Sequence, residues 1–210
     1  MPTRSTTPAR STSKTQIVEM LKADHKKVKK AFKEFEKLDP REDAEACEAL
    51  VEQTCDDLEV HAELEEQVFY PAAREAVKDV DLLDEAEVEH MTAKVLIGQL
   101  RGMSAQDDKF AATFKVLGEY INHHVEEEEG QIFRQLGSSA AEWDTVLERM
   151  QQRRAELMEE KGLPAEQAAA PARPGKARSR PAAGRGRKGA AEARPQAAGG
   201  RSTGSDGDEE

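Results

Sequence analysis

The chain has 210 residues, and its 42 Asp and Glu outnumber its 31 Lys and Arg, which gives a formal net charge of −11. This length is enough for one domain of ordinary size with tails. The sequence contains no run of about 18 apolar residues, so we expect no transmembrane helix. Residues 1–13 lack the apolar segment of a secretory signal, so we expect a cytoplasmic protein.

The charge is unevenly distributed along the chain. Residues 161–210 contain 10 basic and 6 acidic side chains, which leaves 21 basic and 36 acidic ones in residues 1–160, a net charge of −15. A domain this acidic is not expected to bind nucleic acid by itself. Residues 161–201 carry a net charge of +8 and could contact nucleic acid or an acidic protein surface weakly. A solubilising tail without a fixed partner is the alternative.

The spacing of apolar residues predicts an all-α domain over residues 14–161. Apolar positions three and four residues apart indicate four long helices and a shorter fifth one, over residues 14–38, 43–78, 82–102, 107–136 and 140–161. The fifth helix is expected to pack on the other four, with a partner-facing helix as the alternative. Residues 1–13 read as a disordered leader, and residues 162–210, rich in Ala, Pro, Arg and Gly, as a disordered tail with an acidic end.

Several residues mark the expected helix boundaries. Pro40 follows the first helix, and Pro71 is expected to kink or break the second. Asp107 and Asp108 suit the start of the fourth helix, and Gly137 suits its end. Cys47 and Cys55 lie two turns apart on one predicted helix, roughly 12 Å along its axis. That separation is too long for a disulfide, so we expect reduced thiols.

Four of the five histidines fall on apolar helix stripes, one on each long helix. These are His25, His61, His90 and His124. Glu65 and Glu128 each lie four residues after a histidine, a spacing that stacks both side chains on one helix face. Buried glutamate is rare unless it is paired or coordinates something, and no Lys or Arg lies on these stripes nearby. The pattern therefore predicts a metal site.

The sequence does not decide which histidine and which glutamate of the fourth helix face the metal site. His123 also has a glutamate four residues later, Glu127, and Glu127 or Glu129 could replace Glu128 as a ligand. We interpret His123 as peripheral, because it lies about 100° around the helix from His124.

Four imidazoles and two carboxylates are too many ligands for one tetrahedral zinc ion. They suit two metal ions bridged by the carboxylates, and this N/O ligand set favours iron, with manganese or zinc behind it. With a bridging oxide or hydroxide, about ten of twelve octahedral positions are filled. A small molecule such as O₂ could bind at the open positions.

The chain resembles the hemerythrin-like, HHE cation-binding domain proteins over about residues 14–136. The motifs that carry this resemblance run from Asp24 to Val28, from His61 to Glu66 with Phe69-Tyr70-Pro71, at Glu89-His90, and from His123 to Glu129. The resemblance implies an up-down-up-down four-helix bundle with a non-haem di-iron centre between the helices. It also implies that the ligands are His25, His61, Glu65, His90, His124 and Glu128, with the two glutamates bridging.

Two positions depart from the oxygen-carrying hemerythrins. Lys94 stands where they have a further histidine, and Glu129 stands where they have an aspartate. Both differences argue against reversible O₂ carriage. Ferritin-like di-iron proteins match less well, because they use Glu-x-x-His and this chain has the reverse order.

We therefore expect a di-iron protein that binds or senses O₂, nitric oxide or peroxide, or that handles iron. One alternative is a di-iron enzyme that turns over peroxide or O₂, although a binding protein fits the sequence better. Another is a helical interaction module whose basic tail touches nucleic acid.

Overall fold

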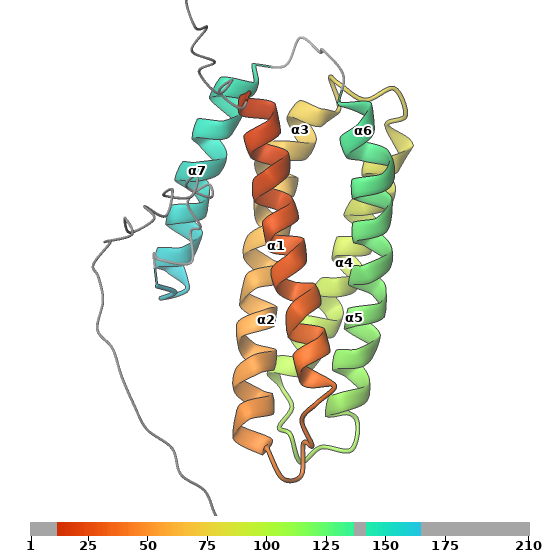
Figure 1. The fold of residues 1–210 in the computed structure, drawn as a ribbon, viewed down its shortest axis with the longest axis vertical. Helices are drawn as coiled ribbons and strands as arrows, with labels where there is room; N and C mark the ends of the chain where they lie inside the picture. Colours follow the sequence, from red (N-terminus) through yellow and green to blue (C-terminus); the bar gives the residue numbers. More distant parts are fainter. Residues whose placement is uncertain (1–11, 137–141, 165–210) are drawn as a thin grey trace, which may run out of the picture. The chain divides into compact units, whose positions relative to one another are not determined.

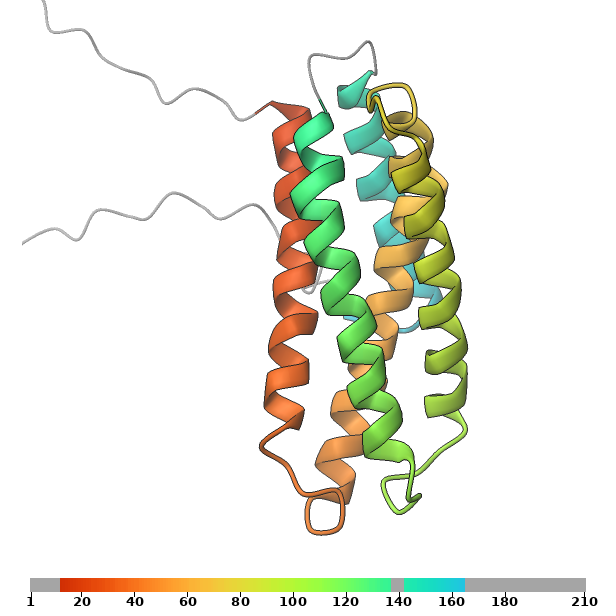
Figure 2. The same cartoon turned by 90° about the vertical axis from the view of Figure 1, so that its right-hand side faces the viewer.

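The computed structural model describes residues 12–136 and 142–164 of the chain, and all regular elements in these residues are helices. Four long helices run up-down-up-down in a bundle: α1 (Ser13–Phe35), α2 (Ala44–Leu64), α4 (Asp81–Arg101) and α5 (Phe110–Glu127) (Figures 1 and 2). Helix α7 (Trp143–Glu160) packs against α1 and α2 on the outside of the bundle. The predicted all-α bundle with an additional helix is confirmed.

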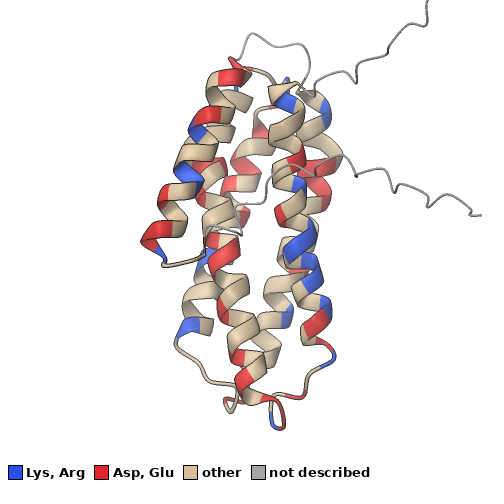
Figure 3. Cartoon of the chain, turned by 60° about the vertical axis from the view of Figure 1, so that its left-hand side comes forward, with Lys and Arg blue, Asp and Glu red and all other residues tan. Residues whose placement is uncertain are grey.

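The expected leader and most of the expected tail lie outside the described residues, as does Gly137, so the predicted domain boundaries stay predictions. Lys, Arg, Asp and Glu are distributed along the bundle helices and α7 (Figure 3). Among the described residues, no helix combines the length and the apolar character that crossing a membrane requires.

Two π-helical turns follow the two His-x-x-x-Glu motifs. They are η1 (Glu65–Phe69), which continues α2 into α3 (Tyr70–Ala73), and η2 (Glu128–Ile132), which continues α5 into α6 (Phe133–Gln135). In each turn the carbonyl of the first glutamate accepts a hydrogen bond from the N–H five residues later, that of Tyr70 or Phe133. Such turns insert one extra residue into a helix and occur frequently at functional sites.

The turn η1 explains why the second helix differs from its prediction. A regular helical period continued from His61 and Glu65 would bury Ala72, but Ala73 is buried instead, because the extra residue of the π turn shifts the following residues by one position. Pro71 lies in the first turn of α3, where its missing N–H is tolerated, and the helix ends at Ala73 rather than at residue 78. The turn η2 contains no proline, so proline is not what these turns have in common.

Two other boundaries differ from the predictions. Helix α1 ends at Phe35 rather than at residue 38, because Lys37 and Leu38 donate to carbonyls three residues back in a tighter turn. Helix α5 begins at Phe110 rather than at residue 107. The carboxylate of Asp107 accepts from the backbone N–H and the hydroxyl of Ser104, so Asp107 closes the preceding loop instead of starting the helix.

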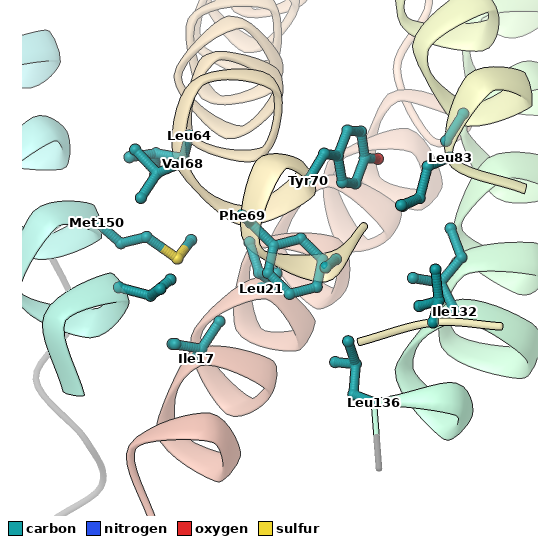
Figure 4. Packing of buried hydrophobic residues seen from close by; sticks show 14 of the residues in the cluster. Ile17, Leu21, Leu64, Val68, Phe69, Tyr70, Leu83, Ile132, Leu136 and Met150 are labelled. Carbon is teal, nitrogen blue, oxygen red and sulfur yellow. The ribbon is translucent and has the colours of Figure 1, made fainter. Parts of the chain in front are cut away.

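The interior consists of two hydrophobic cores. The first joins both π turns to α1, α4 and α7 and includes Leu21, Phe69, Leu83, Ile132 and Met150 (Figure 4). The second fills the other half of the bundle and includes the aromatic rings of Phe32, Phe35, Phe110 and Phe114. Cys47 and Cys55 are free thiols on α2 and are buried in the second core.

Helices α1 and α5 approach each other closely in the second core. A Cβ added at Gly118 would lie 3.0 Å from the ring of Phe32. Phe32 is held in turn by Phe114, whose ring centroid is 4.9 Å away. A glycine on α5 therefore sets the distance between these two helices.

Candidate metal centre

A layer of histidine and glutamate side chains is buried between the four helices. His25, His61, His90 and His124 come from α1, α2, α4 and α5, and all four are buried. Glu65 and Glu128, the first residues of the two π turns, are 0 % exposed. The structure thus brings all six residues that the sequence singled out into one layer.

The ring nitrogens of this layer face one another in two pairs. The Nε2 atoms of His25 and His61 are 3.1 Å apart, and those of His90 and His124 are 3.2 Å apart. Glu65 lies between the pairs, with its Oε2 at 3.2 Å from Nε2 of His61 and 3.4 Å from Nε2 of His90.

Two groups of potential ligand atoms result from this geometry. One contains His25, His61, Glu65 and Glu128, the other contains Glu65, His90 and His124, and within each group the atoms lie within 4.8 Å of one another. Glu65 belongs to both groups.

The two buried carboxylates are only partly satisfied within the layer. Oε1 of Glu65 and both carboxylate oxygens of Glu128 are buried without a hydrogen-bond partner. Nε2 of His25 lies 3.2 Å from Oε2 of Glu128, but the pair lacks hydrogen-bond alignment. Burial and the nearby charge of Glu65 raise the pKa of Glu128 above its usual value. Buried charges normally pair or coordinate metals, so the donor set fits bound cations.

The pKa values of His61 and Glu65 indicate a site that attracts positive charge. Burial lowers the pKa of His61, but the carboxylates of Glu65 and Asp24 outweigh it and hold that pKa well above 6.5. Burial raises the pKa of Glu65, but His61 and His90 hold it well below 4.5. A metal ion bound here would take the place of a proton on the imidazole.

Four outer carboxylates orient the four imidazoles. Each accepts from the Nδ1 side of one histidine, in the pairs Asp24–His61 (3.5 Å), Glu66–His90 (3.1 Å), Glu89–His124 (2.9 Å) and Glu129–His25 (2.9 Å). Each pair joins neighbouring elements, so the carboxylates form a closed ring from α1 through α2, α4 and α5 back to α1. Such bonds fix ring orientation, here with Nε2 inward, and raise the basicity of a ligating histidine.

The sequence reasoning assigned no role to Asp24, Glu66 or Glu89, and it considered Glu129 only as an alternative inner ligand. The sequence does contain one indication of them. Each outer carboxylate directly precedes or follows a residue of the inner layer in the sequence, as Asp24 precedes His25. Each reaches the histidine of a different helix, and helical periodicity alone does not predict such contacts.

The alternative ligands on α5 differ in burial. The His123 side chain is 61 % exposed, and its Nε2 lies 3.6 Å from both Glu89 and Glu127 at the surface. His124 and Glu128 are the residues that lie in the interior. Glu129 contacts the outward Nδ1 of His25 rather than the inner nitrogens.

Tyr70 is a further site residue that the sequence reasoning did not place. Its hydroxyl donates to Oε2 of Glu65 at 3.3 Å, and its ring stacks on His90 with centroids 5.6 Å apart. Burial and the Glu65 carboxylate raise the pKa of Tyr70 well above 10, so the hydroxyl keeps its proton. The π turn brings Tyr70 inward, which a continuous 3.6-residue period does not predict.

A small cavity adjoins the histidine layer on the side of the second core. Its volume is about 20 Å³, and a site of roughly 10–15 Å³ can hold one water molecule. The four histidines line it together with apolar side chains that include Val28, Leu58 and Ile121. Lys94 also lines the cavity. Its Nζ pairs with Oε2 of Glu66 at 2.7 Å, not with the inner glutamates.

Three comparisons with known proteins bear on this site. Residues 16–136 match the family model of the hemerythrin HHE cation binding domain. The crystal structure of a hemerythrin HHE cation binding domain-containing protein, the Rv2633c homolog from Mycobacterium kansasii, superimposes with a TM-score of 0.55 at 20 % identity, covering 71 % of this chain and 94 % of that one. At this identity the likeness concerns the fold.

A protein from Nostoc sp. described as a DNA nickase is 27 % identical over 129 residues. The match covers 61 % of this chain but 36 % of that protein, so the chain spans about a third of the relative's length.

Proposed function

Because the chain belongs to the hemerythrin HHE cation-binding domain family, we propose that it is a non-haem di-iron protein that binds or senses O₂, nitric oxide or peroxide, or that handles iron. The family accounts for cation binding. The number of ions, their identity and the small ligand are inferred from the site.

The observation that carries the proposal is that Glu65 belongs to both groups of ligand atoms. His25, His61, Glu65 and Glu128 would hold one ion, and His90, His124 and Glu65 the other. Both oxygens of Glu128 are unpartnered, so this carboxylate could hold an ion beside His25 and His61. This mixed N/O set favours iron, with manganese or zinc less suited. Bound iron would supply redox chemistry and open positions for a small molecule.

The surrounding side chains restrict what reaches the site. The cavity of about 20 Å³ has room for only a small molecule, and its lining combines the four histidines with apolar side chains. On the opposite side, the Tyr70 hydroxyl holds a proton 3.3 Å from Glu65. Cys47 and Cys55 are free thiols, which fits the reducing cytoplasm that we propose as the compartment.

Elemental analysis and an optical spectrum of the protein purified in air test the proposal. We expect two irons per chain and near-ultraviolet absorption that bleaches on reduction with dithionite. A folded protein that takes up no metal, even during anaerobic loading with Fe(II), would refute the di-iron proposal.

A second candidate is an enzyme that turns over peroxide or O₂, and the buried Tyr70 hydroxyl is the observation that favours it. Peroxide consumption by the iron-loaded chain that falls in a Tyr70→Phe variant with unchanged iron content would support this function. Binding of a small ligand without turnover would support the binding or sensing function.

The DNA nickase relative favours a third candidate, contact with nucleic acid. Residues 1–160 carry a net charge of −15, so such contact would come from the basic residues 161–201. DNA retention that weakens with salt and disappears when residues 162–210 are removed would support it.

A further inference from the structure

Helix α7 lies beyond residues 16–136, which the family model matches, yet one of its side chains contacts an outer carboxylate of the histidine layer. The helix runs alongside α1 and α2 (Figure 1). Arg154 lies on its inner face among Met150, Leu157 and Met158 and is 8 % exposed. An arginine this deeply buried requires a charged partner.

The partner of Arg154 is Asp24 on α1. Nη1 of Arg154 donates to Oδ1 of Asp24 at 3.0 Å, and Nη2 donates to Oδ2. This bidentate contact fixes both the position and the plane of the carboxylate. The same Oδ2 faces Nδ1 of His61 at 3.5 Å. A contiguous chain therefore runs from α7 through Asp24 to an inner histidine.

The other three outer carboxylates are held from within the bundle. Glu129 pairs with Lys22 on α1 and Glu66 with Lys94 on α4, while Glu89 lies beside His123 on α5. Among the described residues, Asp24 is the outer carboxylate whose cationic partner, Arg154, comes from α7. The orientation of His61 thus depends on the docking of α7, whereas His90 and His124 are oriented without it.

We propose that Arg154 is a positioning residue for the metal centre, and that through Asp24 it sets how tightly the ion held by His25, His61, Glu65 and Glu128 is bound. This inference rests on the proposed function, because it needs a metal ion at His61. Removing an outer partner of a ligating histidine weakens metal binding by roughly 10–100-fold. The coupling is reciprocal, so the bound ion also favours the docked position of α7.

Iron release from the full-length chain tests this inference. Wild type and variants are loaded anaerobically with Fe(II) and mixed with an excess of a chromogenic chelator. In Arg154→Gln, we expect release of one iron to accelerate by roughly 10–100-fold, while the other iron keeps the wild-type rate. Asp24→Ala should have the same effect, and the double variant should release iron no faster than either single variant, because the two residues act through one contact.

Lys161→Gln is the matched control. Lys161 ties the end of α7 to Asp56 and Glu59 on α2, and these contacts involve none of the inner histidines. This variant removes contacts at the end of α7 but keeps the Arg154–Asp24 contact, so both release rates should stay unchanged. Equal acceleration in Arg154→Gln and Lys161→Gln would overturn the proposal, because Arg154 would then be only a docking residue.

Two further measurements keep the test decisive. Circular dichroism shows whether Arg154→Gln folds. If it does not, Arg154→Lys is used instead, because it keeps the charge but loses the bidentate contact. This variant should accelerate release of the same single iron. Unchanged release in a folded Arg154 variant would refute the positioning role. A wild-type chain that binds no iron would instead refute the proposed function, and this result is visible before any variant is compared.

Discussion

Glu128→Gln should make the metal-free protein more stable while it weakens metal binding. Glu128 is 0 % exposed, and neither of its carboxylate oxygens has a hydrogen-bond partner. Leaving a buried polar group unsatisfied costs about 1–3 kcal/mol, and the nearby charge of Glu65 adds to this cost. The amide removes the charge and its repulsion from Glu65 but still leaves buried polar atoms, so we expect a gain of only about 1 kcal/mol in the free energy of unfolding.

Urea unfolding followed by circular dichroism measures this gain in metal-free protein, and elemental analysis measures the iron retained after loading. A stabilisation of this size raises Tm by about 2–4 °C per kcal/mol in a domain of this length. Glu126→Gln is the control, because Glu126 is exposed on the same helix and its substitution should change stability by less than about 0.5 kcal/mol. A metal-free Glu128→Gln protein no more stable than wild type would show that this carboxylate is not an uncompensated buried charge.

Three further predictions concern the layer and the second core. His61→Ala should remove most of the bound metal and His123→Ala should not; elemental analysis showing the reverse would mean that the site is misplaced. Gly98→Ala should raise the free energy of unfolding by about 0.5–1 kcal/mol, since nothing lies within 4 Å of the added Cβ. Gly118→Ala should lower it by about 1 kcal/mol, because the Cβ would meet a phenylalanine ring on α1 at 3.0 Å; equal urea midpoints for the two variants would contradict this. Burial raises the pKa of Cys55 to about 12, so the folded state keeps a proton that the unfolded state loses near pH 8.5. Stability should therefore fall as the pH rises above about 8.5, by at most ~1.4 kcal/mol per unit from this group, and Cys55→Ala should flatten the decline.

The sequence by itself determined the bundle and which histidines face its interior. Apolar residues three and four positions apart define one buried stripe per helix, because the α-helical period is local and regular. His25, His61, His90 and His124 lie on those stripes, and they are buried where the period puts them. The i, i+4 spacing of His61 and Glu65 likewise needs only the geometry of a single helix.

Tertiary structure decided the features that depend on more than one helix or on a break in the period. The π turn η1 places Tyr70 and Ala73 in the interior, because it adds one residue that a regular helical period does not contain. The contact of Glu65 with histidines on two helices and the placing of Asp24 by Arg154 join residues distant in sequence. Such contacts are set by how the helices pack against one another, and a pattern read along one helix carries no information about the distance to the next.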